Sequence, residues 1–120
     1  MANLEALTAD HLQAARADVH GRSAELIVRD GVLRQSVIAL RSGAELAEHN
    51  SPDAASIQIL TGRVVITSQG DRDLELTAGQ LTALTHHRHA VRALEDAAFL
   101  LTTVTSVGQQ EGPERGAPPA

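Results

Sequence analysis

The sequence predicts an all-β fold, a small antiparallel sandwich or closed barrel that follows one short helix. Short segments rich in Val, Ile and Leu, eight or more of them, recur at regular spacing between residues 23 and 106. Turn-forming pairs such as Asp30-Gly31 separate them, whereas residues 4–19 show helical spacing. With 120 residues there is room for one domain, and closing the sheet into a barrel would remove unpaired strand edges.

The helix is expected within an N-terminal arm, residues 1–22. Positions on one face recur there at intervals of three to four residues, namely Leu4, Leu7, His11 or Leu12, Ala15 and Val19. Thr8 or Asp10 is expected to cap its main segment, and His20-Gly21 to end it. Two interpretations stay open: the helix lies across the sheet, or it serves as a dimerisation arm.

The barrel is expected to span residues 23–107. Its predicted strands are 23–29, 32–41, 44–51, 55–60, 63–68, 72–77, 80–85, 90–94 and 97–106. Residues 51–53 are expected to form a loop, because the proline among them has no amide hydrogen for a strand ladder. Residues 108–120, GQQEGPERGAPPA, are too polar to bury apolar area and are predicted to be a disordered tail.

Composition argues against several functions. Phe99 is the single aromatic residue, so base-stacking platforms and aromatic sugar pockets lack their rings. A net charge of −5 disfavours nucleic-acid binding, which depends on clustered cations. Without cysteine there is no disulfide or thiolate ligand. The N-terminus lacks a basic region followed by an apolar run, and no apolar stretch reaches membrane length. We expect a soluble cytoplasmic protein without nucleic-acid or membrane partners.

Two motifs resemble those of small single-domain bacterial cupins. In the first, Gly43, five residues, His49, a loop with proline and an apolar strand ending at Gly62 match the family's spacing. In the second, His89 matches and Gly79 lies within one residue of its expected place, while the proline, inner glycine and asparagine positions hold Leu84, His86 and Ala93. The resemblance covers about residues 23 to 106 and implies a jelly roll, or double-stranded β-helix.

The cupin resemblance also implies a metal site of three imidazoles and one carboxylate, which would hold Zn, Fe, Mn or Ni. Here the second histidine position holds Ser51 and the carboxylate position holds Ala55. His87 and His89 share one face of an extended chain, so they could join His49 in a three-nitrogen site for one divalent metal. The alternative is a histidine-rich turn at the barrel rim without a metal.

Two functions follow from these residues. In the favoured one, the chain is a small-molecule binding or sensing barrel, with an incomplete metal site and no catalysis. Its ligand pocket would include His49, Ser51, His89 and Arg88, of which Arg88 could hold an anionic carboxylate in its guanidinium fork. In the other, the chain is a metal-dependent enzyme in which His49 and His89, with or without His87, hold the ion, and the resemblance to cupins implies a dioxygenase or an isomerase.

A homodimer is expected from resemblance and from one feature of the sequence. Segments such as 32–40 and 56–67 carry apolar residues on both alternating faces, which is more than one barrel interior can bury. A second copy could cover the outer face. The small molecule that the barrel would bind is not identified by the sequence.

Overall fold

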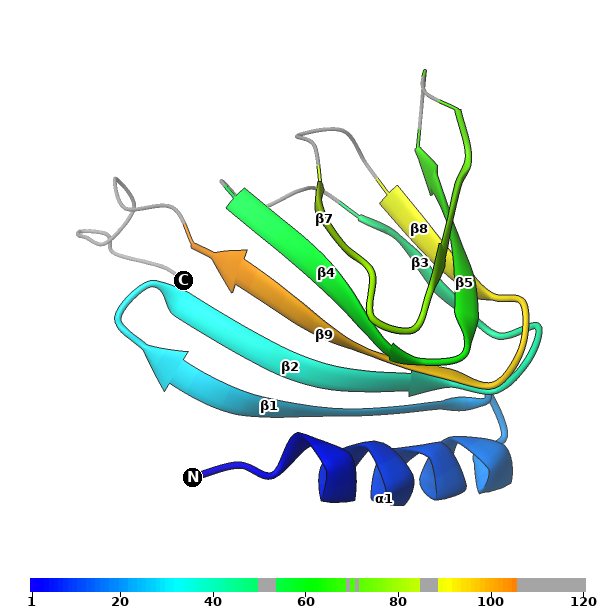
Figure 1. Cartoon of the computed structure of the whole chain (residues 1–120), viewed down its shortest axis with the longest axis horizontal. Helices are drawn as coiled ribbons and strands as arrows, with labels where there is room; N and C mark the ends of the chain where they lie inside the picture. The colour runs from blue at the N-terminus through cyan, green and yellow to red at the C-terminus, as the bar shows by residue number, and fades with distance from the viewer. Residues whose placement is uncertain (50–53, 69, 71, 85–88, 106–120) are drawn as a thin grey trace.

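Two antiparallel sheets that face each other build the protein, and a helix lies on the outside of one of them (Figure 1). The computed structural model describes residues 1–49, 54–68, 70, 72–84 and 89–105, and of Glu48 and His49 it describes the backbone. Within these residues the elements are α1 (Leu4–Ala17), β1 (Arg22–Asp30), β2 (Leu33–Leu40), β3 (Glu45–His49), β4 (Ala54–Thr61), β5 (Arg63–Ser68), β6 (Leu74–Thr77), β7 (Leu81–Leu84), β8 (His89–Ala93) and β9 (Ala97–Val104). The predicted all-β class with a short N-terminal helix is confirmed.

The strand order shows how the chain wraps around its core. One sheet has the order β1-β2-β9-β4-β7 and the other β3-β8-β5-β6. Every described pairing is antiparallel. The chain crosses from one sheet to the other between β4 and β5 and crosses back between β6 and β7. This alternation is the predicted jelly roll, and the strands lie within one or two residues of the predicted segments.

The core lies between the two sheets. Every second residue of a strand points inward, and these inward-facing side chains form the core. In β4, Ile57 and Ile59 are fully buried while Gln58 between them is half-buried, as strand alternation requires. Phe99 of β9 is fully buried as well. The remaining large core side chains come from both sheets: Ile38, Leu40, Val64, Ile66, Leu76 and Val91.

The turn between β4 and β5 requires glycine for two reasons. Gly62 has a φ of 82°, a left-handed conformation that L side chains rarely adopt. A Cβ atom at this position would also lie 2.7 Å from the Ala97 Cα and still closer to the Asp96 carbonyl oxygen. The backbone of the β8–β9 connection therefore passes directly over this turn, and the close approach joins the two sheets at this end.

The N-terminal helix packs on the sheet that contains β1, β2 and β9 (Figure 1). Its cap is Asn3, whose side-chain oxygen accepts from the Ala6 amide at 2.9 Å, so the prediction of a cap at Thr8 or Asp10 was wrong. The cap lies at the start of the periodic segment because an asparagine directly before Leu4 can accept from a first-turn amide that has no partner within the helix. The helix thus lies on the sheet, as one of the two interpretations expected, and a role as a dimerisation arm stays a prediction.

Helix α1 also covers part of the second apolar face that the sequence presents. Ala15 of the helix is buried against Ala39 of β2 and Ala98 of β9, while Ile38 and Leu40 of β2 point into the core. The apolar residues on both faces of β2 thus have a partner within the chain. The homodimer stays a prediction, and this strand does not require it.

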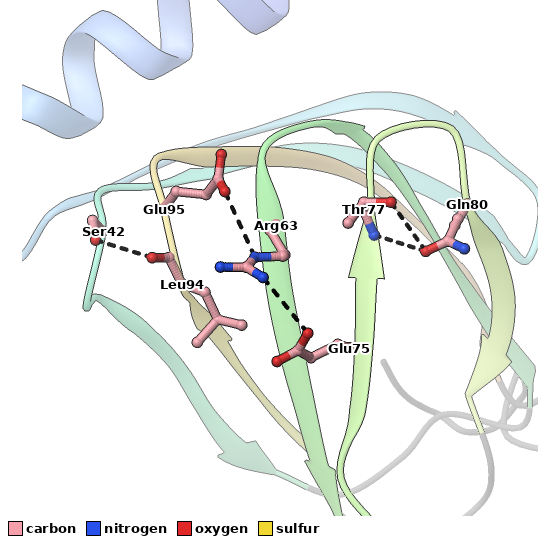
Figure 2. Close-up of polar contacts among 7 residues, drawn as sticks. All are labelled: Ser42, Arg63, Glu75, Thr77, Gln80, Leu94 and Glu95. Carbon is pink, nitrogen blue, oxygen red and sulfur yellow. Dashed lines mark hydrogen bonds and ion pairs between the residues drawn. The ribbon is translucent and has the colours of Figure 1, made fainter.

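Polar contacts tie the strands together at the end of the barrel where β5 begins (Figure 2). Arg63 lies between two carboxylates, with Nη1 3.8 Å from Glu75 Oε1 and Nε 3.6 Å from Glu95 Oε2. In the turn between β6 and β7, Gln80 Oε1 accepts from the Thr77 amide at 2.8 Å. These contacts are exposed, and each contributes at most about 1 kcal/mol.

Several predicted features lie outside the described residues. These are the loop at 51–53, the histidine-rich turn at 86–88 and the tail at 108–120. In the described part of the chain, no helix has the length and apolar character needed to cross a membrane.

Candidate functional site

A hollow of about 210 Å³ opens between the two sheets at the end of the barrel opposite the Arg63 contacts. At this end β5 and β7 finish and β6 and β8 begin, and Figure 1 shows the sheets farther apart here than at the β4–β5 turn. The lining residues come from both sheets and from the segment before β6: Ile66, Ser68, Arg72, Leu74, Thr82, Ala83, Leu84 and His89.

The hollow is apolar at its floor and becomes more polar toward its rim. Ile66 belongs to the buried core and Leu84 packs against that core, so these two side chains form the base. Leu74 is 45% exposed and Arg72 is exposed, which places both at the entrance. Ser68 and Thr82 add hydroxyl groups between these levels. Such a combination of apolar walls and a few polar groups is typical of sites for small molecules.

Strand pairing brings together two histidines that are 40 positions apart in the sequence. His49 of β3 is the register partner of His89 of β8, and on its other side His89 is the register partner of Ser68 of β5. The three positions therefore form one row across the four-stranded sheet. The sequence predicted that His49 and His89 meet at one mouth of the barrel, and the backbone register sets the two positions side by side there.

The other predicted site residues are not all placed by the structure. His89 lines the hollow. Ser51, His87 and Arg88 lie outside the described residues, so their assignment to the pocket or to a metal stays a prediction.

Sequence reasoning missed most residues that line the hollow. One signal was present: in the segment 63–68, Val64, Ile66 and Ser68 occupy alternate positions and share one face. Because Val64 and Ile66 are core residues, Ser68 had to extend the inward-facing row as its polar member. Arg72 gave no such signal, because it lies before β6 and belongs to no alternating strand pattern. The fold of the segment between β5 and β6 places it at the hollow.

Charge within the hollow is set by Arg72. Of the described residues that line the hollow, it carries the one permanent charge, and none of them is acidic. Elsewhere Arg16 pairs with Asp96 and Arg63 with two glutamates, whereas no ion pair joins Arg72 to another described residue. Arg72 thus places one exposed guanidinium group among the described residues that line the hollow.

The described residues do not fit a complete cupin metal site. They contain no group of three or more His, Asp or Glu side chains that could hold an ion. At the position of the expected carboxylate ligand stands Ala55, held in β4 opposite Leu84 and Thr103. The notion of a third nitrogen ligand rests on His87, which lies outside the described residues.

The shifted acidic groups lie away from the hollow. The pKa of Asp96 is lowered by the hydrogen bond from the Arg16 side chain and then by the Ser42 amide. The pKa of Asp18 is lowered by backbone hydrogen bonds from Arg22 and His20. Both carboxylates are structural, since they fasten the C-terminal end of α1 to the barrel.

These features define a small protein with the cupin fold, a double-stranded β-helix with a hollow at its open end. Among solved structures, the chain is similar to a conserved protein of unknown function from Streptococcus pyogenes, with 27% identity over 74% of this chain and 78% of that one and a TM-score of 0.66. It is similar to a cupin superfamily protein from Desulfitobacterium hafniense, with 19% identity over 71% and 78% of the two chains and a TM-score of 0.66.

An enzyme shares the same fold. The DMSP lyase DddQ from Ruegeria pomeroyi is 17% identical over 72% of this chain and 48% of its own, with a TM-score of 0.64. No protein-family model matches the chain, and no curated protein sequence does. The resemblance to cupins is therefore confirmed for the fold, and the comparisons assign no activity.

Proposed function

We propose that the chain is a small-molecule binding or sensing barrel that does not catalyse a reaction, and that its ligand occupies the hollow between β5, β7 and β8. The observation that carries this proposal is the hollow itself, with an apolar floor, two hydroxyl groups, His89 and a charged rim. Its volume is below the roughly 300 to 1,000 Å³ of sites for drug-sized ligands. A small metabolite is the matching class of ligand.

The lining chemistry favours binding over catalysis. His89 offers an imidazole, but none of the described lining residues is a carboxylate that could act beside it as a second acid or base. Ser68 lies in register with His89, yet a serine nucleophile also needs an oriented base and donors for the oxyanion. These groups suit the recognition of a ligand better than the transfer of a proton or an acyl group.

The second candidate is a metal-dependent enzyme, of dioxygenase or isomerase type by resemblance to cupins. The register that sets His49 opposite His89 favours it, because two imidazoles on neighbouring strands are the start of a metal site. Completion of the site would depend on His87. Ala55 weighs against this candidate, since the carboxylate ligand of the family pattern is missing.

Protein-observed NMR with a library of small polar metabolites tests the binding proposal. We expect ligands to shift the amide signals of Ser68, Thr82 and His89 together. Ser68→Phe should prevent ligand binding because the larger side chain fills the hollow. Thr67→Phe, at the neighbouring position of the same strand, should leave ligand binding unchanged. If no compound perturbs these signals at millimolar concentration, the proposal fails.

Metal analysis separates the two candidates. After loading with Zn, Fe, Mn and Ni in turn and removal of free ion, we expect less than one ion per chain, with no difference between wild type and His49→Ala or His89→Ala. A stoichiometric ion that both variants lose would instead support the enzyme.

A further inference from the structure

We propose that the ligand is a short-chain aliphatic carboxylate and that Arg72 selects it. This inference rests on the proposed function and adds the chemical class of the ligand. The sequence assigned the role of an anion-binding fork to Arg88, whereas among the described residues Arg72 holds the position that this role needs.

The first support is electrostatic. The chain has a net charge of −5, yet the hollow is lined by an arginine and, among the described residues, by no acid. Arg63, at the opposite end, lies between two glutamates and is already neutralised (Figure 2). Arg34 and Arg41 donate to backbone carbonyl groups. Arg72 has neither kind of contact with another residue in the described part of the chain.

The second support is the shape of the lining. Ile66 and Leu84 form an apolar floor, and Leu74 leaves an apolar side chain 45% exposed at the rim. A short alkyl chain on these residues would remove apolar surface from water on both sides. A free phosphate or sulfate would leave the floor uncovered. The lining therefore suits a molecule with one charged end and one apolar end.

The third support is size. The hollow, at about 210 Å³, is smaller than the roughly 300 to 1,000 Å³ of sites for drug-sized ligands. Acids of about four to six carbons match this space. A planar carboxylate also accepts two parallel hydrogen bonds from a guanidinium, which a neutral amide of the same shape cannot match in strength.

Calorimetric titration of the full chain with matched pairs tests the inference. The probes are butyrate with butyramide and hexanoate with hexanamide, which differ in charge and hardly in shape. We expect each acid to bind about tenfold or more tightly than its amide, because a charge-assisted hydrogen bond is lost in the amide. Arg72→Gln should abolish this preference and leave amide binding as in wild type. Arg72→Lys should keep part of it, since the charge remains and the fork is lost.

Arg92→Gln is the matched control. Arg92 is exposed on β8, between core residues Val91 and Ala93, and does not line the hollow, so the substitution removes the same charge at a position outside the hollow. It should keep the preference. The inference would be overturned if the wild-type protein bound acid and amide equally, or if Arg72→Gln and Arg92→Gln lost the preference for the acid to the same extent.

The NMR screen distinguishes this failure from failure of the proposed function. Neutral or cationic compounds that shift the Ser68, Thr82 and His89 signals, in the absence of binding by butyrate and hexanoate, would refute the carboxylate and leave the binding barrel intact. Absence of any ligand for the hollow would refute both.

Discussion

Substitution of Gly62 by alanine is expected to destabilise the protein far more than the same substitution at Gly79. Both glycines have positive φ, 82° and 89°, so both variants pay for a left-handed alanine, roughly 1 to 2 kcal/mol. Both also gain about 0.4 to 1 kcal/mol because alanine restricts the unfolded chain. At Gly79 nothing lies within 4 Å of the added Cβ, so a net loss of about 1 kcal/mol is expected.

At Gly62 the added atom meets backbone rather than a movable side chain. It would lie 2.7 Å from the Ala97 Cα, so the β8–β9 connection has to shift away from the turn. Forced overpacking of this kind costs typically 1 to 3 kcal/mol, which brings the expected loss for Gly62→Ala to about 2 to 4 kcal/mol. Ile66 and Ser68 follow on the same strand, so ligand binding should weaken as well.

Equilibrium unfolding in urea measures the two free energies directly. Gly43→Ala is a further control, because Gly43 has a φ of 87° and open space around it. It should resemble Gly79→Ala, although Gly43 and Gly62 both belong to the cupin-like motif. A difference of less than about 0.5 kcal/mol between Gly62→Ala and the two controls, at equal m-values, would refute the argument from close approach.

Three further predictions follow from the described contacts and from the sequence. Because the Arg16 hydrogen bond lowers the pKa of Asp96 in the folded protein, its stabilisation is present above the ordinary aspartate pKa, near 3.9, and is lost as the pH falls through the lowered value. Asp96→Asn should flatten the acid limb of the unfolding free energy, and an unchanged limb would contradict this. In α1, His11 Nδ1 lies 2.7 Å from Ser23 Oγ and His11 Nε2 lies 2.9 Å from Glu25 Oε1, so the side chain ties the helix to β1. His11→Ala should therefore speed hydrogen exchange of the α1 amides and leave that of the barrel amides unchanged, and equal acceleration of both would argue against this tie. Light scattering at micromolar concentration should give the mass of a homodimer, and a monomeric mass would refute that prediction.

Strand positions were predictable because they depend on local pattern. The alternating apolar residues of β4 and β5, with Gly62 between them, define two strands and a turn without reference to the rest of the chain. The helix was predictable for the same reason, although its cap was not. Asn3 directly precedes the periodic segment, and its role as the cap follows from the hydrogen bond that its side chain accepts from the Ala6 amide in the folded backbone.

The site was predictable in part. His49 and His89 were singled out from motif spacing, and the register of β3 with β8 does set their positions opposite each other. Arg72 was not singled out, because an arginine in a polar segment before a strand has no pattern of its own. Its place at the hollow depends on how β5, β6 and β7 are arranged across two sheets.

The sequence by itself determined the all-β class, the strand segments, the single core and the cupin-like motif with its missing carboxylate at Ala55. These features are encoded in residue types and their spacing over short distances. The tertiary structure decided which faces are covered, since α1 buries Ala39 and Ala98 on the outer side of the sheet. It also decided where the hollow lies and that Arg72 stands at its rim. Strands distant in sequence meet at the hollow, and long-range packing rather than local preference determines which strands are neighbours.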